Sequence, residues 1–374
     1  MKFKDPAIVV HQLQKWGGAE YELKVLASIF NKCTIYTAWY DDEFREQYFE
    51  NFVLRSSILQ KFPYKEKLDR ELIPLHPLAY STLDLSKHDL VIVLSDGFEK
   101  TVRIPEGIPS ILIALTPPRF LWMETRSINS LSSFSYSVYD KFLKGSLQSL
   151  WRKWDLNSVK QYKYLISISD EVRKRVAKIY DRSSEIIYPP VEINKMKFNR
   201  NTQSREDWYL YFGRVESYKG VELAIRAVAE GHFRLKIAGS GSDLERMRSL
   251  VDELGVRHLV GFLGFVSEKQ KRELLYKCKA LIFPVKDEDF GIIPIEANAS
   301  GAPVIAYAGG GVLETIKEGV SGVFFREYSP RALIDTIKDF EKMSFDPNLC
   351  RSQAVQFSRD RFENKLKAYL RGIS

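Results

Sequence analysis

Two glutamates, Glu288 and Glu296, lie eight positions apart in the segment Lys286–Glu296, which follows the apolar run Leu281–Pro284. Gly291 stands between them and allows the backbone to approach a ligand closely. The helix that we expect after Gly291 would present its N-terminal N–H groups to an anion. Helix periodicity does not explain both carboxylates, so we expect Glu288 in the loop and Glu296 within the helix, facing a cleft. A buried carboxylate needs a partner, and a ribose diol is a suitable one.

Two further loops of the same half could bind an anion. The first, Gly213–Gly220, follows the apolar run Tyr209–Phe212 and carries two cations, Arg214 and Lys219. Two cations at the carboxyl end of a strand can neutralise a diphosphate without a metal, although most Arg and Lys side chains beside a turn are simply solvated. The second loop, Gly239–Ser242, has the composition of a phosphate-cradling turn, but its glycines could serve only the chain reversal.

Three consecutive glycines, Gly309–Gly311, and Glu314 complete this region of the sequence. Glycines placed directly before a helix indicate that the backbone approaches another group closely. The alternative is that they form only a flexible connection between a helix and a strand.

The elements that must hold these loops are indicated by short apolar runs, which alternate with amphipathic helical patterns along the chain. Strand–helix alternation predicts an α/β fold, in which parallel sheets carry helices on both faces. The runs form two series, which implies two Rossmann-like domains with a boundary between Tyr188 and about Asp207. The predicted strands are Ala7–Val10, Thr34–Thr37, Leu90–Leu94, Ile111–Leu115, Tyr164–Ile168, Glu185–Ile187, Tyr209–Phe212, Leu235–Ala238, Leu259–Leu263, Leu281–Pro284, Val304–Tyr307 and Val323–Phe325. The predicted helices include Ala19–Phe30, Glu171–Tyr180, Val221–Ala229, Asp243–Leu254, Glu268–Lys277 and a long last helix at Ser352–Leu370.

Length and composition exclude several classes of protein. The 374 residues suit two domains, and 45% hydrophobic with 28% charged residues is typical of a soluble globular chain. The three cysteines are far apart and form neither a disulfide nor a metal-ligand pattern, which favours a reducing, cytoplasmic compartment. We recognise no secretory signal and no run that approaches the about 20 apolar residues of a membrane span.

Nearly all of the net charge of +8 lies in one segment, because residues 141–182 contain eleven Lys and Arg against four Asp and Glu, a net of +7. Basic and apolar positions alternate there around Trp151 and Trp154, so the segment could contact an anionic membrane at the inner face of the cytoplasmic membrane. Alternatively, the tryptophans pack in the first domain and the cations are solvated. A single basic face, without a helix-turn-helix or an aromatic-and-basic sheet, argues against nucleic acid as a partner.

Several motifs occur in an order that resembles one enzyme family. The segment EDFGIIPIE, its continuation ANASGAPVIAYAGGGVLETIKEGVSGVFF and the earlier YFGRVESYKGVELAIRAV together resemble the retaining GT-B glycosyltransferases of family 4, whose hallmark is two glutamates separated by seven residues. The resemblance is strong over Tyr209–Phe325. In the first half, GGAE, LTPPRFLW and ISISDEVRKRV are most similar to bacterial and archaeal mannosyltransferases that build O-antigen or other cell-surface glycans.

This resemblance implies the GT-B fold, with two Rossmann-like domains, a cleft between them and a C-terminal helix that crosses back to the first domain. It implies an acceptor-binding domain at 1–188, a nucleotide-sugar-binding domain at 189–351 and the returning helix at 352–374. The implied reaction transfers a hexose from a nucleotide-diphosphate sugar to a glycan or lipid-linked acceptor in cell-surface polysaccharide synthesis.

The resemblance also implies a role for each site residue. Arg214 and Lys219 would bind the donor diphosphate and stabilise the charge that develops on it as it leaves. Glu288 would hold hydroxyls of the donor sugar, and Glu296 would hold the ribose. The other implied donor-binding residues are Gly17 and Gly18 near the diphosphate, Phe265 and Val266 beside the base, and Phe290, Gly291, Ile292 and Ile293 through their backbone N–H groups.

Members of the family keep the anomeric configuration and need no metal, and the leaving diphosphate itself would deprotonate the acceptor. GDP-mannose is the first expectation for the donor, by resemblance alone, and UDP-glucose or another UDP-sugar remains open. The string Asp287-Glu288-Asp289 also matches the D-x-D metal motif of other glycosyltransferases. Its setting before FGIIPIE fits the glutamate pair better, so we expect no metal site there.

The chain departs from the family pattern at two acceptor-side positions. Many relatives carry His where this chain has Leu115, just before the sequence Thr-Pro-Pro-Arg that ends at Arg119, and a second His where it has Asp96. Asp96 could contact sugar or acceptor, or it could be a solvated turn residue. Two other functions stay open: a GT-B sugar-nucleotide epimerase, which would need acid and base groups in the cleft, and a non-catalytic sugar-binding protein, against which the intact charged residues count.

Overall fold

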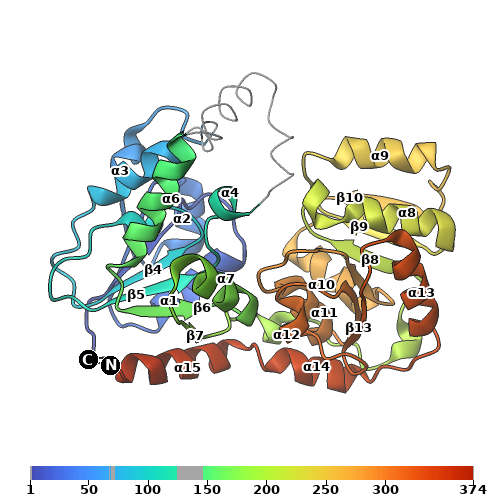
Figure 1. Ribbon diagram of the computed structural model, residues 1–374. Coiled ribbons are helices and arrows are strands. Elements are labelled where there is room, and N and C mark those ends of the chain that lie inside the picture. The colour runs from blue at the N-terminus through green and yellow to red at the C-terminus, as the bar shows by residue number, and fades with distance from the viewer. Residues whose placement is uncertain (1, 67, 69–71, 124–145, 374) are drawn as a thin grey trace. The chain divides into compact units, whose positions relative to one another are not determined.

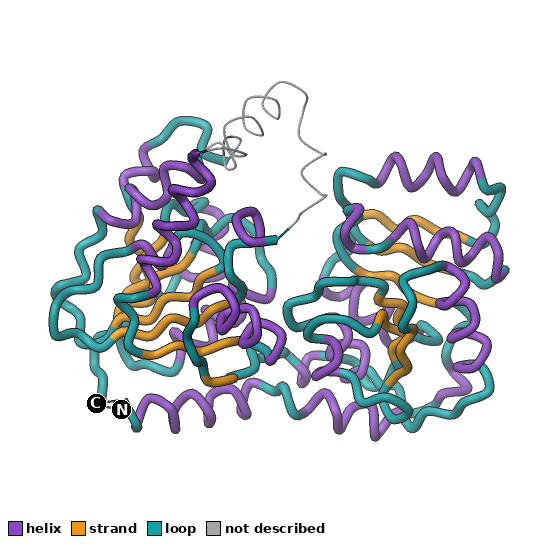
Figure 2. The backbone as a smooth tube through the Cα atoms, in the orientation of Figure 1, coloured by secondary structure: helices purple, strands orange, loops and turns teal. Residues whose placement is uncertain are grey.

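The computed structural model describes residues 2–66, 68, 72–123 and 146–373. In that part the chain forms two compact units, and in each unit helices cover a sheet of strands (Figures 1 and 2). The first unit contains the described residues up to Pro190 together with residues 359–373, and the second contains Val191–Ser358.

The first unit is built on a seven-stranded parallel sheet in the order β3-β2-β1-β4-β5-β6-β7. Its central strands β1, β2, β4 and β5 are buried along their whole length, as expected of a sheet with helices on both faces. The strands are β1 (Ala7–Val10), β2 (Thr34–Thr37), β3 (Val53–Ser56), β4 (Val91–Ser95), β5 (Ser110–Ala114), β6 (Tyr164–Ser167) and β7 (Glu185–Ile186). The helices are α1 (Gly18–Ser28), α2 (Asp42–Phe49), α3 (His76–Ser81), α4 (Arg119–Trp122), α6 (Ser146–Val159), α7 (Asp170–Tyr180) and α15 (Arg359–Arg371).

The second unit is built on a six-stranded parallel sheet in the order β10-β9-β8-β11-β12-β13. Its core gathers apolar side chains of these strands and of the helices that pack on them, among which α8 and α13 contact each other. The strands are β8 (Tyr209–Phe212), β9 (Leu235–Ala238), β10 (Val260–Gly264), β11 (Leu281–Phe283), β12 (Val304–Tyr307) and β13 (Gly322–Phe325). The helices are α8 (Val221–Gly231), α9 (Leu244–Glu253), α10 (Glu268–Lys277), α11 (Ile292–Ala299), α12 (Val312–Thr315), α13 (Pro330–Phe340) and α14 (Pro347–Val355).

In each sheet the first strand of the unit lies in the interior of the sheet. Later strands are added first on one side of it and then on the other, so the strand order reverses once. In the first unit β1 pairs with both β2 and β4, and in the second unit β8 pairs with both β9 and β11. Open α/β sheets bind their ligands at the carboxyl edge beside such a reversal. The loops after β8 and β11, and separately those after β1 and β4, are therefore the places where each fold can position a site.

The predicted alternation of strands and helices is confirmed in both units, and one strand was not predicted. Val53–Ser56 forms the edge strand β3, whose residues are alternately exposed and half-buried. The prediction relied on continuous apolar runs, which mark strands buried on both faces. A short edge strand with an arginine in it carries no such run.

The prediction of one last helix over Ser352–Leu370 is wrong, because the chain forms two helices there, α14 and α15. Phe357, between them, is buried, and its carbonyl oxygen accepts a hydrogen bond from the Val191 N–H at 2.9 Å. Only α15 belongs to the first unit, where Arg359 donates to Ser28 at 3.0 Å, whereas α14 packs on α11 of the second unit.

Candidate functional site

The loops after β8 and β11 meet beside the reversal of the second sheet. The loop after β8 ends in a short 3₁₀ helix, Ser217–Lys219, and Gly220 then begins α8 with a φ of +74°. A Cβ on Gly220 would lie 2.3 Å from the carbonyl oxygen of Pro284, which follows β11. Only glycine fits at that position, so the two loops are held in backbone contact.

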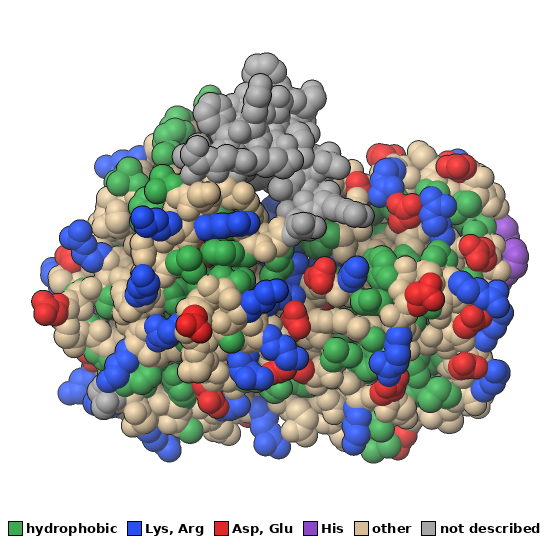
Figure 3. Space-filling model, viewed as in Figure 1, with side chains coloured by type: hydrophobic (Ala, Val, Ile, Leu, Met, Phe, Trp, Pro, Cys, Tyr) green, Lys and Arg blue, Asp and Glu red, His purple; other side chains and the backbone are tan. Residues whose placement is uncertain are grey.

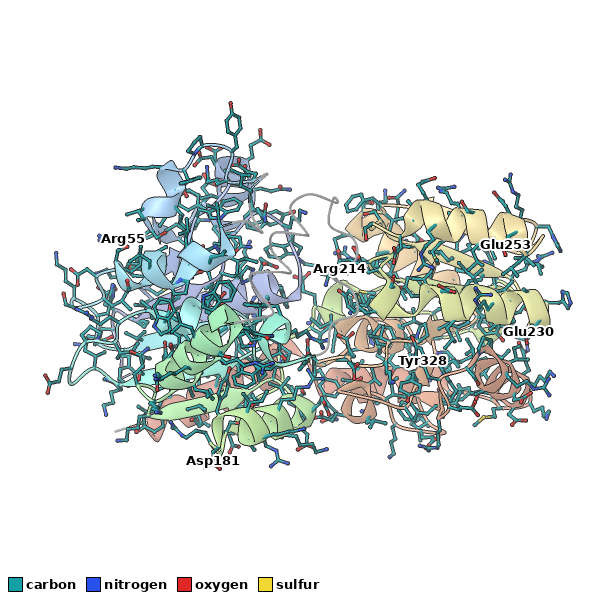
Figure 4. All side chains as sticks on the ribbon, turned by 45° about the horizontal axis from the view of Figure 1, so that its top comes forward. Arg55, Asp181, Arg214, Glu230, Glu253 and Tyr328 are labelled. Carbon is teal, nitrogen blue, oxygen red and sulfur yellow. The ribbon has the colours of Figure 1, made fainter. Side chains whose placement is uncertain are left out.

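Three of the predicted site residues come to this edge of the sheet. Lys219 Nζ lies 3.0 Å from Glu288 Oε2, and the two side chains keep 20% and 17% of their surface exposed. The Arg214 guanidinium and the Lys219 ammonium lie 5.8 and 5.3 Å from the centre of the Tyr218 ring. Arg214 is exposed on its loop, as Figure 4 shows. The second unit therefore gathers two cations and one carboxylate where its fold can position a ligand.

The three glycines after β12 fix the loop that carries Glu288. A Cβ on Gly310 would lie 2.3 Å from the Glu288 carbonyl oxygen, and one on Gly311 would lie 2.5 Å from the Asp289 carbonyl oxygen. The Gly311 N–H also donates to the Glu288 carbonyl oxygen at 2.9 Å. The glycines therefore permit a close approach of two loops, and they do not form merely a flexible connection.

The start of α11 can receive an anion. Gly291 precedes the helix with a φ of +96° and has no side chain to cap it. The first N–H groups of a helix have no partner within the helix, and they carry the positive end of its dipole. Ile292 and Ile293 form this first turn and are partly exposed. Phe290 is buried against Phe357, with ring centres 5.5 Å apart, so the preceding loop is anchored in the core.

Glu296 is buried in the second turn of α11, with 7% of its surface exposed. Its Oε1 accepts a hydrogen bond from Lys271 Nζ at 2.7 Å, while its buried Oε2 has no hydrogen-bond partner among the described residues. Burial raises the pKa of Glu296, and the charge of Lys271 acts against that rise. Burial also works to lower the pKa of Lys271, but Glu296 and Glu268 outweigh it and raise that pKa. Lys271 therefore stays charged, and one oxygen of Glu296 can accept a further hydrogen bond.

Sequence reasoning missed Lys271, whose side chain is only 8% exposed. It lies in the highly charged stretch EKQKRELLYK, where one more lysine is unremarkable. The signal that could have found it is helical spacing, because Lys271 lies four residues before the buried Leu275 and so faces the core with it. A lysine in the apolar stripe of a helix indicates a buried partner of opposite charge.

The glycines of the loop after β9 serve contact between loops. A Cβ on Gly239 would lie 1.9 Å from the Gly213 carbonyl oxygen, and one on Gly241 would lie 2.2 Å from the Val215 carbonyl oxygen. The Val215 N–H donates to the Ser240 carbonyl oxygen at 3.0 Å. This close approach accounts for both glycines without a phosphate.

Phe265 and Val266 follow β10, the edge strand of the second sheet. Gly264 precedes them with a φ of +65° and turns the chain. Phe265 is 83% exposed, whereas Val266 is partly buried. A ring exposed to this extent adds little to the packing of its own unit, so its apolar faces are available to a ligand.

The predicted residues of the first unit lie at the carboxyl edge of the first sheet. Gly17 and Gly18 begin α1 after β1. Asp96 follows β4 and is exposed, whereas Leu115 follows β5 and is buried. Arg119 begins α4 and is half-buried. The first sheet therefore gathers all five residues at one edge. The roles of Gly17 and Gly18 toward the donor diphosphate, and those of Asp96, Leu115 and Arg119 toward an acceptor, remain predictions.

His11, which sequence reasoning also missed, follows β1 at this same edge. Its Nε2 lies 2.8 Å from Glu20 Oε1, and Glu20 belongs to the Gly-Gly-Ala-Glu motif in α1. Burial works to lower the pKa of His11, but the bond to Glu20 and the negative charges of Asp96 and Glu99 raise it to about 9. The edge of the first sheet thus carries an imidazolium next to the exposed Asp96.

The basic segment predicted over residues 141–182 lies partly outside the described residues, which resume at Ser146. Trp151 packs in the first unit against Phe98 and Leu121, so one of the two tryptophans is a core residue. Trp154 and Leu150, in contrast, are 43% and 56% exposed on α6. Figure 3 shows Lys and Arg side chains over the first unit, interspersed with a few acidic ones. None of the helices described in residues 2–123 and 146–373 is both long enough and apolar enough to cross a membrane.

The string Asp287-Glu288-Asp289 lies in the loop between β11 and α11. Glu288 of this string is paired with Lys219. Across the described ranges, no group of three or more His, Cys, Asp and Glu side chains is placed to hold a metal ion.

The second unit is similar to a known family of enzymes. Residues 192–357 match the model of the glycosyl transferases group 1. The matched residues make up almost the whole of the second unit and less than half of the chain. Glu288 and Glu296, on either side of Gly291, lie inside the matched residues, as do the cations Arg214 and Lys219. The description of the matched model names the same enzyme class that the motifs predict, a glycosyltransferase.

Curated relatives of the chain carry names of the same enzyme class. An uncharacterized glycosyltransferase of Methanocaldococcus jannaschii is 33% identical over 188 residues, which cover 45% of this chain and 48% of the relative. The alpha-1,3/1,6-mannosyltransferase ALG2 of Mus musculus is 26% identical over 240 residues, which cover 55% of this chain and 56% of the relative. The chain therefore matches about half the length of these relatives.

A crystal structure of Anabaena HepE in complex with UDP shares the fold of the whole chain. Its TM-score is 0.72 at 18% identity, and the superposition covers 98% of this chain and 100% of HepE. Likeness at this level of identity concerns the fold alone. It confirms the predicted GT-B architecture of two Rossmann-like domains, of which the second contains residues 192–357.

Proposed function

We propose that this chain is a metal-independent, retaining glycosyltransferase that moves a hexose from a nucleotide-diphosphate sugar to a glycan or lipid-linked acceptor. The observation that carries the proposal is the arrangement around Gly291. Glu288, before it, lies 3.0 Å from Lys219, and Glu296, after it, is buried with one oxygen unpartnered among the described residues. The family resemblance assigns the donor sugar to Glu288 and the ribose to Glu296, and both positions suit those roles.

Three positively charged groups of the second unit could bind a diphosphate. Arg214 and Lys219 lie 5.8 and 5.3 Å from the centre of the Tyr218 ring, and the uncapped start of α11 adds the positive end of a helix dipole. In the proposed reaction these groups stabilise the charge that develops on the leaving nucleotide diphosphate, which is the task a metal performs in other enzymes. The leaving phosphate oxygen takes the proton of the acceptor hydroxyl on the same face of the sugar, so the configuration is retained.

GDP-mannose is the donor that we propose first. It is supported by the motif similarity of the first half and by the name of the mannosyltransferase ALG2 among the relatives. A UDP-sugar is the alternative, and it is supported by the HepE crystal structures, which contain UDP or UDP-glucose. We further propose that the acceptor is presented at the inner face of the cytoplasmic membrane, next to the exposed Leu150 and Trp154 of α6.

A panel of nucleotide sugars tests the donor directly. A ligand that binds only the native state raises the melting temperature, so a thermal-shift series of GDP-mannose, UDP-glucose, UDP-galactose and UDP-N-acetylglucosamine identifies base and sugar together. The donor that binds is then incubated with the chain and simple acceptor glycosides. Proton NMR of the product reports the anomeric configuration, and an inverted product would refute the retaining mechanism.

Turnover in excess EDTA tests the metal-independent part of the proposal. We expect the initial rate of donor consumption to change by less than about twofold, because Arg214 and Lys219 supply the positive charge. A loss of activity that Mg²⁺ or Mn²⁺ restores would revive the D-x-D interpretation of Asp287-Glu288-Asp289.

A further inference from the structure

The buried partner of Glu296 is Lys271, which lies outside every sequence motif assigned to the donor site. Lys271 projects from α10 and is buried to the same degree as Glu296, with side-chain exposures of 8% and 9%. Its ammonium lies 2.7 Å from Glu296 Oε1 and 3.0 Å from Glu268 Oε1. It also lies 5.9 Å from the centre of the Phe212 ring, at the carboxyl end of β8. Lys271 therefore joins α10, α11 and the end of β8.

An isolated carboxylate in this place would be protonated or would turn away. Transferring a charge from water into the protein interior has a large free-energy cost. A partner of opposite charge can offset this cost. Glu268, at the exposed rim, supplies a second acceptor for the lysine, so the ammonium remains charged as it holds Glu296. The hydrogen bond occupies one carboxylate oxygen and leaves the buried Oε2 as an acceptor with no partner among the described residues.

We propose that Lys271 is a positioning residue for nucleotide binding: it holds Glu296 ionised and oriented, so that Oε2 accepts a hydrogen bond from a ribose hydroxyl of the donor. This inference rests on the proposed function, because it assumes that a nucleotide occupies the site. Lys271 itself contacts no part of the nucleotide in this proposal. Lys271 acts through the Glu296 carboxylate. Replacing Lys271 should therefore remove the contribution of the ribose hydroxyls to nucleotide affinity.

The test compares two ligands on matched variants. Calorimetry measures the affinity of UDP and GDP for the wild type, and the tighter of the two is then compared with its 2′,3′-dideoxy form. The variant is Lys271→Met, and the control is Lys269→Met, which makes the same change two residues away at an exposed position of the same helix. We expect the wild type and the control to lose about tenfold in affinity when the hydroxyls are removed, as for hydrogen bonds to a charged group.

In Lys271→Met we expect the hydroxyls to contribute less than about twofold, because Glu296 no longer presents a charged acceptor. Adding Lys271→Met to Glu296→Gln should then weaken binding no further, since both changes remove one interaction. If Lys271→Met does not fold, Lys271→Gln replaces it, because it removes the charge and keeps a hydrogen-bond donor.

The outcomes separate the two claims. If neither UDP nor GDP binds to the folded wild type, or if the hydroxyls contribute nothing there, the proposed donor site fails and this inference fails with it. If the hydroxyls contribute in the wild type and contribute equally in the Lys271 variant, Lys271 does not position Glu296, and the donor site stands without it.

Discussion

Lys219 Nζ lies 3.0 Å from Glu288 Oε2, and this contact joins the loops that follow β8 and β11. The lysine is proposed to bind the donor diphosphate, whereas the glutamate is proposed to hold hydroxyls of the donor sugar. The carboxylate and a diphosphate would share one ammonium group, so they compete for part of its charge. The two residues should therefore respond differently to nucleotide alone and to nucleotide sugar.

Substituting Lys219 and Glu288 separates these roles. We expect Lys219→Ala to weaken nucleotide diphosphate binding about tenfold or more, because a charge-assisted contact to phosphate is lost. We expect Glu288→Gln to bind the same nucleotide at least as tightly as the wild type and to lose most of its transfer rate. Calorimetry and a transfer assay measure the two effects. The exposed Lys317→Ala serves as a control, and weaker nucleotide binding by Glu288→Gln would show that the carboxylate holds Lys219 in place instead of competing for it.

A pair of glycines tests how Glu288 is held. Gly310 and Gly319 have φ values of +70° and +74°, but a Cβ would meet the Glu288 carbonyl oxygen at 2.3 Å in the first case and nothing within 4 Å in the second. Alanine at Gly319 should destabilise the fold by about 1 kcal/mol through backbone strain alone. Alanine at Gly310 should cost about 1–3 kcal/mol more, because the loop must move, and should also reduce turnover.

Urea unfolding followed by circular dichroism measures the stability of both glycine variants, and the transfer assay measures turnover. Both alanines would adopt a similar positive φ, so the cost of backbone strain is similar in the two variants. The difference between their unfolding free energies therefore reports the steric overlap at Gly310. Equal stability and equal turnover would mean that the glycine loop does not fix Glu288.

Phe265 offers a test with little effect on the fold. Its side chain is 83% exposed, so Phe265→Ala should leave the melting temperature unchanged within error. If the ring stacks on the base, nucleotide affinity should fall about tenfold. Leu349→Ala, at a residue that is 50% exposed on α14, is the control for loss of an exposed apolar side chain. Unchanged affinity in Phe265→Ala would remove this residue from the donor site.

The ion pair between His11 and Glu20 predicts a pH-dependent stability of the first unit. The pKa of His11 is about 9 in the folded chain against 6.5 for an ordinary histidine, so the stabilisation is complete below pH 6.5 and is lost as the pH rises through about 9. Because the His11 side chain keeps 21% of its surface exposed, we expect about 1–3 kcal/mol. Glu20→Gln should therefore destabilise the protein at pH 7 and much less above pH 9.

Tryptophan fluorescence during urea unfolding follows this effect, because five of the six tryptophans lie in the first unit and only Trp208 lies in the second. The difference in unfolding free energy between wild type and Glu20→Gln is measured at both ends of the pH range. A difference that stays constant would show that His11 is not held in its charged form.

The sequence predicts the sheets well because the central strands are continuous apolar runs, as Ala7–Val10 and Tyr209–Phe212 illustrate. Apolar runs and glycines also predict where the loops turn. They do not predict β3, whose residues alternate between exposed and half-buried positions, nor the break at Phe357, which depends on contacts with Val191 and Phe290 far away in the sequence.

In the candidate site, too, the sequence predicts the residues of one segment but not their partners from other segments. The sequence indicates Glu288 and Glu296 as site residues because they lie on either side of a glycine that precedes a helix. Their partners are not visible in that segment, since Lys219 and Lys271 lie 69 and 25 residues away and only the parallel sheet brings them together. The glycines Gly309–Gly311 predicted a close approach, and only the structure identifies the backbone of Lys286–Asp289 as the group approached.

The helix α15 belongs to the first unit although it follows the second unit in the sequence. The second unit is closed within Val191–Ser358, where its first and last residues form a bridge. The first unit needs α15, because Arg359 reaches Ser28 of α1 and Tyr369 packs on Tyr164 at the start of β6. During synthesis the second unit thus has all of its residues before the first does, although it is encoded later. The half of the chain that leaves the ribosome first therefore lacks one of its helices until synthesis has passed the second unit.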